Sequence, residues 1–396
     1  MHDVLVVGGG PAGCYAASLL GARGLDVQLL EEHPVIGEPV DCSGVIGVES
    51  FETLGLPESL KLAEISALTL VSPSELEVYF SPPSPLAYVI DRAAFDRSIA
   101  DRTTASGAVV HLGVHVVDLQ VQRDCVEVTY TRALDGRSPS GIERKTLRGK
   151  MVMLAGGPRY GLQKKLHMGH PGDFLKTAQT ELPAQGITGT KVFLGSGVAP
   201  GSFAWIIPFR RGSEQFARVG VSAKVNAVPF LKSLLLKLYR ADHVFSPEVP
   251  VRSWVIPVSP LKRTYAERVL AVGDAAGQTK PTTGGGIFYG LLCAEAAAQT
   301  AERAFKTGDF TAGSMRTYEK IWRGKLGREM RTGSFFRRLA ERLTDKEIDD
   351  LFRVVQSDGI LSAITKKARF DWHKDVIFFA LRHASLGRIF LKGLFR

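Results

Sequence analysis

Residues 4–31 read VLVVGGGPAGCYAASLLGARGLDVQLLE and begin with the apolar run Val4–Val7. A glycine turn, Gly8–Gly13, follows at once, and an alanine-rich segment, Cys14–Ala22, comes after it. A second apolar run, Asp26–Glu31, ends the stretch. A strand, a tight glycine turn, a helix and another strand in this order predict the first βαβ unit of a dinucleotide-binding fold.

The glycine turn has the spacing that a dinucleotide pyrophosphate requires. Gly8, Gly10 and Gly13 form the pattern GxGxxG, and Pro11 and Ala12 stand between the last two glycines. Small residues at these positions let a phosphate approach the backbone N–H groups at the start of the helix. We therefore expect these five residues to contact the cofactor.

An acidic residue follows at the distance that dinucleotide sites use for a ribose. Glu31 ends the second expected strand, about 20 residues after the glycine turn, where a carboxylate can accept hydrogen bonds from ribose hydroxyls. Glu32 is the alternative for this role. Strand alternation and spacing favour Glu31.

A second glycine-rich segment lies far along the chain. Residues 272–287 read VGDAAGQTKPTTGGGI, between a short apolar strand, Arg268–Gly273, and an expected helix, Phe288–Ala304. Asp274 can bind a hydroxylated chain such as the ribityl group of a flavin, and the N-terminus of the helix favours the negative charge of a reduced flavin. The expected flavin contacts are Gly273, Asp274, Pro281, Gly284, Gly285, Gly286 and Ile287.

The two separated segments resemble the FAD-binding signature of the flavoprotein hydroxylase superfamily and of its geranylgeranyl reductase family. The resemblance covers about residues 1–300 and implies FAD as the cofactor. It also implies that Arg92, in the sequence YVIDRAAFD, approaches the FAD pyrophosphate; a solvated arginine at a helix start is the alternative. Gly156 stands where hydroxylases usually carry an aspartate that supports pyridine-nucleotide use, so NADPH and a ferredoxin are both candidate electron donors.

A further motif resembles geranylgeranyl reductases more narrowly. Residues 200–208, PGSFAWIIP, are similar to the family motif PxxYxWxFP, which implies that Phe203, Trp205, Ile207 and Pro208 bind the substrate. Alternation places the first three on one face of a strand, and an aromatic wall of this kind suits an isoprenoid chain without polar groups. An ordinary sheet core shows the same alternation and is the alternative.

Residues 37–44, GEPVDCSG, resemble the cysteine-containing loop of archaeal geranylgeranyl reductases. The resemblance implies that Cys42 lies beside the flavin and next to the reacting bond, as a cofactor contact and as the catalytic residue. Saturating an unactivated double bond needs a hydride at one carbon and a proton at the other, and a thiol or an ordered water beside the ring could deliver the proton. The alternative is that Cys42 is a small buried hydrophobe.

The order of strand and helix signals predicts an α/β + β fold with a discontinuous Rossmann-like FAD-binding domain, an inserted antiparallel-sheet substrate domain and a helical C-terminal region. Alternating runs predict a meander, Val114–Val121, Val126–Thr131 and Lys150–Leu154, and a hairpin, Phe203–Phe209 with Phe216–Ser222. We expect the FAD-binding domain at 1–50, 88–165 and 262–305, the substrate domain at 51–87 and 166–261, and the C-terminal region at 306–396.

Composition limits the class of protein. The chain has 396 residues, of which 45% are hydrophobic, so it can bury large cores. No apolar run approaches the roughly 18 residues of a membrane span, and the chain shows no secretory leader, which predicts a cytoplasmic protein, free or peripheral at the inner face of the membrane. Four separate cysteines without a His/Cys cluster favour neither a disulfide framework nor a metal site.

The net charge of +10 fits nucleic acid, an anionic membrane surface or an acidic partner. We expect two C-terminal helices, Arg328–Leu343 and Ala380–Phe395, and the second fits either a membrane interface or a helix packed on the domain with a solvated basic face. That helix combines Leu381, Ile389, Phe390, Leu394 and Phe395 with Arg382, Arg388, Lys392 and Arg396. The chain carries no nucleic-acid-binding signature, so we expect no nucleic-acid partner. We also expect a monomer.

The resemblance to geranylgeranyl reductases, together with these signals, implies an FAD-dependent oxidoreductase of lipid biosynthesis that saturates double bonds of geranylgeranyl or other isoprenoid chains on lipids or prenyl diphosphates. One alternative is a monooxygenase or quinone-linked dehydrogenase of the same superfamily, which NADPH-coupled oxygen consumption would reveal. The other is a non-catalytic isoprenoid-binding protein, which would stay colourless after incubation with FAD.

Overall fold

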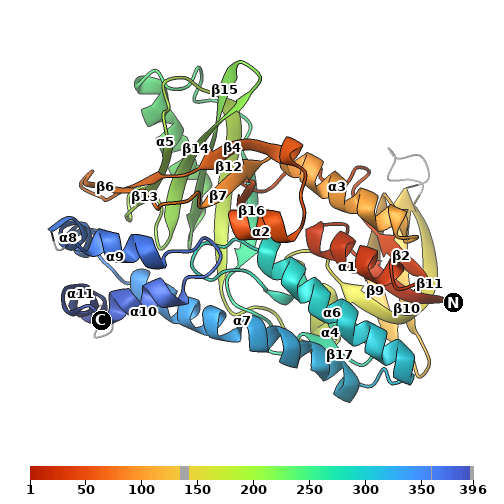
Figure 1. The fold of residues 1–396 in the computed structure, drawn as a ribbon. Helices are drawn as coiled ribbons and strands as arrows, with labels where there is room; N and C mark the ends of the chain where they lie inside the picture. The colour runs from red at the N-terminus through yellow and green to blue at the C-terminus, as the bar shows by residue number, and fades with distance from the viewer. Residues whose placement is uncertain (134–141, 358, 393–396) are drawn as a thin grey trace. The chain divides into compact units, whose positions relative to one another are not determined.

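The computed structural model describes residues 1–133, 142–357 and 359–392 (Figure 1). The chain divides into two compact units, and each unit is assembled from three separate segments. The first comprises residues 1–40, 92–173 and 257–328, and the second comprises residues 41–91, 174–256 and 329–396. The prediction of a discontinuous Rossmann-like domain with an inserted sheet domain is confirmed.

The first unit is built on an eight-stranded sheet in the order β17-β18-β11-β1-β2-β8, with β10 and β9 continuing from β11. β1 (His2–Val7) pairs in parallel with β2 (Val27–Leu30) and with β11 (Ile142–Leu154). Continuous apolar runs such as Val4–Val7 are typical of a parallel strand buried on both faces. The other strands are β8 (Val109–His111), β9 (Val114–Val121), β10 (Val126–Ala133), β17 (Tyr265–Ala266) and β18 (Val269–Ala271).

Strand β11 is longer than the expected segment Lys150–Leu154. Its first part pairs antiparallel with β10, and its last part pairs parallel with β1, so one strand joins the meander to the parallel sheet. The part from Met151 to Leu154 is apolar and buried, which made it recognisable. The preceding residues are mainly charged, and they therefore give a weak strand signal.

Three helices of the first unit pack together beside this sheet. α1 (Pro11–Gly21) contacts both α3 (Arg92–Ala105) and α6 (Ile287–Thr307), and α1 and α6 lie side by side in Figure 1. The buried face of α1 consists largely of small residues, which allow neighbouring helices to approach closely. The unit also contains α4 (Gly161–Lys165) and the short 3₁₀ turn η2 (Gly273–Ala276).

The second unit contains a seven-stranded sheet in the order β16-β12-β15-β14-β13-β5-β6 and a three-stranded sheet in the order β3-β7-β4. The expected hairpin is confirmed as β14 (Phe203–Arg211) and β15 (Glu214–Ala223). The remaining strands are β3 (Val45–Gly47), β4 (Lys61–Ile65), β5 (Leu68–Val71), β6 (Glu77–Phe80), β7 (Ala87–Ile90), β12 (Phe174–Pro183), β13 (Thr190–Leu194) and β16 (Arg252–Pro257). The short helices are α2 (Val48–Thr53), η1 (Glu58–Leu60) and α5 (Val228–Arg240).

The two faces of β14 belong to different cores of this unit. Ala204 and Ile206 pack in a cluster with Leu231 of α5, whereas Trp205 and Ile207 pack in another cluster. The second cluster also contains residues of the small three-stranded sheet. Strand alternation therefore sorts the motif residues onto one face, as expected.

The C-terminal region is helical, as predicted, but its helices differ from those expected. They are α7 (Ala312–Ala340), α8 (Asp345–Ser357), α9 (Ile360–Lys367), α10 (Lys374–Arg382) and α11 (Ala384–Lys392). The expected helix Arg328–Leu343 is the later part of α7, and the boundary between the two units falls inside α7. The expected third region, 306–396, is thus shared between the units.

The prediction of one helix over Ala380–Phe395 is wrong. The chain breaks between α10 and α11 at His383, whose backbone is extended. Gly387 packs so closely that a Cβ built on it would lie 2.5 Å from Leu381 O. The apolar periodicity continued across the break and concealed it; Leu394, Phe395 and Arg396 lie outside the described residues.

The apolar face of α11 is packed rather than free. Leu386 and Phe390 are 3% and 5% exposed and form a small core with Leu339 of α7 and Ile360 of α9. Within the described ranges, no helix is both long enough and apolar enough to span a membrane.

Candidate active site

The first glycine turn lies at the N-terminus of α1. Gly10 is the N-cap residue with an extended backbone, Pro11 opens the helix, and no side chain of the described residues caps this end. A Cβ built on Gly13 would lie 2.0 Å from Gly8 O, and a Cβ built on Gly10 would have open space around it to 4 Å. Gly13 is thus required by packing, whereas Gly10 leaves room in front of the positive end of a helix dipole, which suits a pyrophosphate.

Glu31 contacts this turn directly. The Gly9 N–H donates a hydrogen bond of 2.5 Å to Glu31 Oε2, and the backbone N–H of His33 donates one of 2.9 Å to Glu31 Oε1. The side chain is 7% exposed. The structure therefore places the Glu31 carboxylate against the glycine turn, where the ribose was expected.

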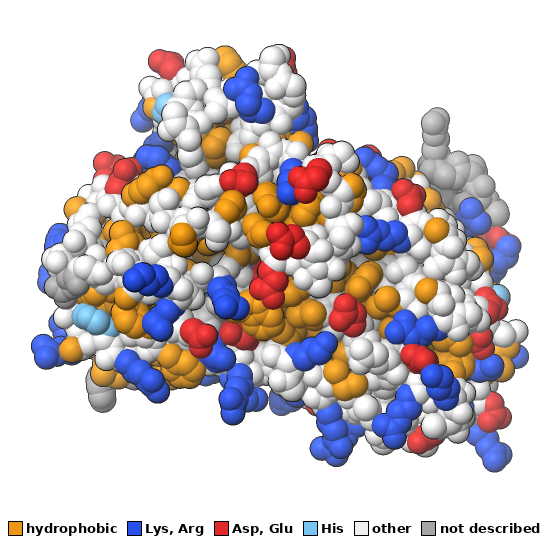
Figure 2. All heavy atoms as spheres, in the orientation of Figure 1, with side chains coloured by type: hydrophobic (Ala, Val, Ile, Leu, Met, Phe, Trp, Pro, Cys, Tyr) orange, Lys and Arg blue, Asp and Glu red, His pale blue; other side chains and the backbone are white. Residues whose placement is uncertain are grey.

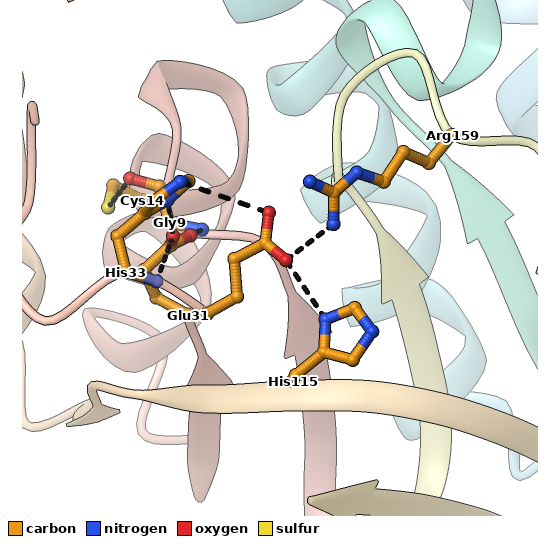
Figure 3. A network of polar contacts seen from close by, with 7 residues as sticks. Gly9, Cys14, Glu31, His33, His115 and Arg159 are labelled. Atoms are coloured by element: carbon orange, nitrogen blue, oxygen red, sulfur yellow. Dashed lines mark hydrogen bonds and ion pairs between the residues drawn. The ribbon is translucent and has the colours of Figure 1, made fainter. Parts of the chain in front are cut away.

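Glu32 has a different set of partners, His115 and Arg159, both of which Figure 3 labels. Its carboxylate accepts hydrogen bonds from Arg159, in the loop after β11, and from His115 Nδ1 of β9, the latter at 2.9 Å. Burial raises the pKa of the Glu32 carboxyl, but these two hydrogen bonds outweigh burial and hold the pKa below its ordinary value. Glu32 thus joins β9 and the loop after β11 to the end of β2.

The two glycine-rich segments meet within the first unit. A Cβ built on Gly273 would lie 3.0 Å from Ala12 Cβ, and a Cβ built on Gly290 of α6 would lie 3.4 Å from the same atom. Ala12 therefore contacts both the η2 turn and α6. Segments about 260 residues apart thus lie against each other, as the paired signature requires.

Asp274 lies at the N-terminus of α6. A Cβ built on Gly286, the N-cap residue of α6, would lie 2.8 Å from Asp274 Oδ1, so glycine leaves the space that the carboxyl group occupies. Burial raises the pKa of Asp274 to about 6, and the charge of Arg92 opposes this rise. Arg92 opens α3 and also pairs with Asp96, at 2.8 Å.

The loop between Lys280 and Gly285 is closed by two backbone hydrogen bonds. Gly284 N donates to Lys280 O at 2.8 Å, and Lys280 N donates to Gly285 O at 3.0 Å. The Lys280 side chain is only 4% exposed, and a Cβ built on Gly285 would lie 2.7 Å from Lys280 Cε. Sequence reasoning missed this buried lysine because lysine is normally an exposed residue.

Four polar side chains that sequence reasoning missed hold the η2 turn and the strand before it. They come from α4 and its N-terminus, from the loop just after the turn and from α7. Their bonds are Tyr160 Oη to Asp274 O (2.8 Å), Gln163 Nε2 to Ala275 O (3.0 Å), Gly273 N to Gln278 Oε1 (2.9 Å), Gln278 Nε2 to Tyr318 Oη (2.8 Å) and Tyr318 Oη to Ala271 O (2.8 Å). Gln278 stands within the second motif and could have been suspected, but no spacing rule links the other three to it.

The expected substrate residues lie in the second unit. Trp205 and Ile207 are 8% and 5% exposed, and Phe203 is partly exposed with its ring centroid 5.9 Å from that of Trp205. Pro208 belongs to the other face of β14, because side chains alternate between the two faces along a strand. Cys42 is partly exposed in the same unit, and the Gly44 N–H donates to its Sγ at 3.4 Å. Their contacts with cofactor and substrate stay predictions.

The residues of the first unit fit FAD. Open space at Gly10, the Glu31 carboxylate beside the glycine turn and the uncapped start of α1 suit the adenosine and pyrophosphate. Asp274 at the start of α6 suits the ribityl chain.

Known proteins agree with this assignment. The profile of the NAD(P)-binding Rossmann-like domain family matches residues 6–41. Over 375 residues the chain is 30% identical to digeranylgeranylglycerophospholipid reductase 2 of Methanothermobacter thermautotrophicus, and the match covers 92% of this chain and 94% of that protein.

Solved structures show the same fold. A geranylgeranyl bacteriochlorophyll reductase-like protein of Thermoplasma acidophilum superposes with a TM-score of 0.84 at 21% identity, over 99% of this chain and 98% of that chain. A variant of the halogenase PltM in complex with FAD superposes with a TM-score of 0.65 at 14% identity, over 99% of this chain and 85% of that chain. From its identity to the reductase across nearly the whole of both sequences, the chain belongs to the geranylgeranyl reductase family of FAD-dependent oxidoreductases.

Proposed function

We propose that this enzyme saturates carbon–carbon double bonds in the isoprenoid chains of lipids or prenyl diphosphates. The observation that supports it is the 30% identity, over 92% of the chain, to a protein named for the reduction of digeranylgeranylglycerophospholipid. Bound FAD, when reduced, supplies a hydride from flavin N5 to one carbon of the double bond, and the other carbon takes up a proton.

The residues of the first unit hold the cofactor in this proposal. Gly8, Gly10 and Gly13 receive the pyrophosphate at the N-terminus of α1, and Glu31 accepts hydrogen bonds from the ribose. Asp274 binds the ribityl chain. The other proposed contacts are Pro11, Ala12, Arg92, Gly273, Pro281, Gly284, Gly285, Gly286 and Ile287.

Cys42 is the proposed proton donor. Its thiol holds a proton at Sγ, and the Gly44 N–H, which donates to that sulfur at 3.4 Å, is placed to stabilise the negative charge left after proton transfer. Phe203, Trp205 and Ile207 present rings and aliphatic carbon to the hydrocarbon chain.

The electron donor is proposed to be a ferredoxin or NADPH. A Cβ built on Gly156 would have Val7 O as its nearest neighbour, 3.8 Å away, so packing does not require a glycine there. Gly156→Asp restores the aspartate of the hydroxylase relatives and should fold normally. If NADPH is the donor, the rate of anaerobic flavin reduction by NADPH should already be substantial in the wild-type enzyme and change little in the variant.

We further propose a peripheral contact with anionic membranes through the C-terminal helices. Figure 2 shows Lys and Arg side chains among hydrophobic ones over this region, and a cleft of about 480 Å³ joins the exposed Phe378 to four cations. Those cations are Lys366, Lys367, Arg369 and Arg382, with Asp375 as the one acidic lining residue. Each cation near an anionic surface contributes about 1 kcal/mol, so sedimentation with phosphatidylglycerol vesicles and not with phosphatidylcholine vesicles is expected.

Anaerobic turnover tests the reaction. Enzyme loaded with FAD and reduced with dithionite is mixed with digeranylgeranylglycerophospholipid, and flavin absorbance and lipid mass are followed. Lipid should reoxidise the flavin, and each saturated bond should add two hydrogens to the product. Reduced flavin that stays reduced with this lipid and with geranylgeranyl diphosphate, but reacts with oxygen to hydroxylate an added substrate, would contradict the proposal.

A further inference from the structure

Three neighbouring strands of the second unit bring Trp205, Gly220 and Gln179 into one row. Trp205 of β14 is paired with Gly220 of β15, and Gly220 is paired with Gln179 of β12. A Cβ built on Gly220 would lie 2.2 Å from Trp205 Cζ2. The indole therefore crosses the position that a side chain at Gly220 would fill, and it reaches the second strand beyond its own.

The indole fixes the orientation of the Gln179 amide. Trp205 Nε1 donates to Gln179 Oε1 at 3.3 Å, and the amide is buried, with 6% of the residue exposed. An indole N–H can only donate, so the oxygen of the amide faces Trp205 and its nitrogen faces away. That nitrogen donates to the carbonyl oxygen of Cys42 at 3.1 Å.

A second buried side chain holds the next carbonyl of the same loop. Arg218 of β15 is 2% exposed, and its NH1 donates to Ser43 O at 2.7 Å and to Ile90 O at 3.0 Å. Its Nε pairs with Glu181 of β12 at 2.8 Å, and the register places these two residues opposite each other. The sheet thus binds the carbonyls of two consecutive loop residues, Cys42 and Ser43.

We propose that Gln179 is a positioning residue for Cys42. Trp205 orients the Gln179 amide, the amide holds the Cys42 carbonyl, and the loop presents the thiol in one direction. The buried Gln179 amide accepts one hydrogen bond through its oxygen and donates one through its nitrogen. Turning the amide away is costly, because Trp205 Nε1 or the Cys42 carbonyl oxygen would then lose this hydrogen bond. The proposal deepens the proposed function and rests on it for the effect on turnover, whereas the effect on the thiol is measured without substrate.

The variant Gln179→Glu tests the hydrogen bond from Gln179 to Cys42 separately from the hydrogen bond from Trp205 to Gln179. A glutamate keeps the oxygen that accepts from Trp205 and loses the N–H that donates to Cys42 O. Gln215→Glu is the matched control, because Gln215 Nε2 also donates to a backbone carbonyl of this unit, that of Ile187, at 2.6 Å.

The measurement is the rate at which iodoacetamide alkylates Cys42 in the FAD-loaded enzyme, followed by mass spectrometry of the Cys42 peptide from pH 6 to 10. Gln179→Glu should change the rate about tenfold at a fixed pH and displace its pH profile, the size of effect expected from one lost buried hydrogen bond. In turnover with the lipid, kcat should fall about tenfold with KM nearly unchanged, because the loop acts on the reacting bond. Gln215→Glu should match the wild type in both assays.

Trp205→Phe gives an independent test if the first variant folds poorly. It keeps an aromatic ring and removes the indole N–H, so the amide loses its fixed orientation and the Cys42 profile should move in the same direction by a smaller factor. An alkylation profile that stays at the wild-type position in the folded variants would overturn the positioning role, even if the enzyme reduces the lipid. A displaced profile in an enzyme that reduces no isoprenoid would support the positioning role and refute the proposed function.

Discussion

Replacing Gly10 by valine perturbs the cofactor site while leaving the protein folded. Gly10 has φ −70° and ψ 175°, an extended backbone that valine adopts without strain, and the space around a Cβ at this position is open to 4 Å. The free energy of unfolding of the FAD-free protein should therefore change by less than about 0.5 kcal/mol.

In the proposed site, the same side chain stands where the pyrophosphate has to approach the start of α1. Phosphate oxygens need N–H donors at about 2.7–3.2 Å, and the added methyl groups keep them out of that range. Losing one or two hydrogen bonds to a charged group, each contributing about 1.5–3 kcal/mol, predicts a Kd for FAD raised by about two orders of magnitude.

Titration of the FAD-free protein with FAD, followed by flavin fluorescence, measures this Kd, and thermal unfolding of the same sample checks the fold. Gly189→Val is the control, since a Cβ at Gly189 also meets open space and lies outside the motif. Gly13→Ala should instead destabilise the protein itself, because its Cβ would lie 2.0 Å from Gly8 O. A folded Gly10→Val protein that binds FAD as tightly as the wild type would refute the assignment of this turn to the pyrophosphate.

Three further predictions concern single side chains. Glu31→Gln should raise the Kd for FAD about tenfold and Glu32→Gln less than about threefold, because only Glu31 contacts the glycine turn; equal effects in the fluorescence titration would contradict this. Burial raises the pKa of Asp274 from 3.8 to about 6, so the folded FAD-free protein loses stability as the pH rises from about 4 to about 6. The melting temperature of Asp274→Asn should therefore exceed that of the wild type by an amount that grows from pH 4 to pH 6. Melting temperatures of the two proteins that differ by a constant amount across this range would count against the prediction. Phe390→Ala should lower the free energy of unfolding in urea by about 3–5 kcal/mol, whereas Leu391→Ala, at a side chain 51% exposed, should change it by less than about 0.5 kcal/mol.

The glycine turn at the start of α1 and its contact with Glu31 were predictable because their constraints are local. A phosphate that binds at a helix N-terminus requires glycines within a few consecutive residues, and the pattern from Gly8 to Gly13 shows such a spacing. The choice of Glu31 over Glu32 also followed from strand alternation, and the structure places Glu31 at Gly9. The two motifs could be paired from sequence because together they resemble a known FAD-binding signature, and the structure brings both against Ala12.

The supporting side chains were not predictable in the same way. Tyr160 and Tyr318 bond to backbone atoms of the second motif and its preceding strand from positions far away in sequence, and a tertiary hydrogen bond leaves no local pattern. Gly220 reads as an ordinary glycine within an apolar strand; its importance emerges only when the indole of Trp205 is seen to occupy its side-chain space. The break at His383 was hidden for a related reason, since the apolar period continues through it.

The fold leaves the reaction open, because a halogenase bound to FAD shares it with a reductase-like protein. The reaction must therefore be determined by side chains. The row Trp205–Gly220–Gln179 offers one example, in the proposed substrate residue Trp205. The indole N–H and the Gln179 amide are engaged with each other and with the backbone of Cys42. In the proposed function Trp205 contacts the substrate, and with its N–H engaged it would offer only the surface of its ring, which suits a hydrocarbon chain better than a polar aromatic acid or phenol. On this reasoning, a variant that frees the indole N–H, such as Gln179→Leu, should weaken the preference for purely hydrocarbon chains over hydroxylated analogues, and competition between the two substrates would measure it.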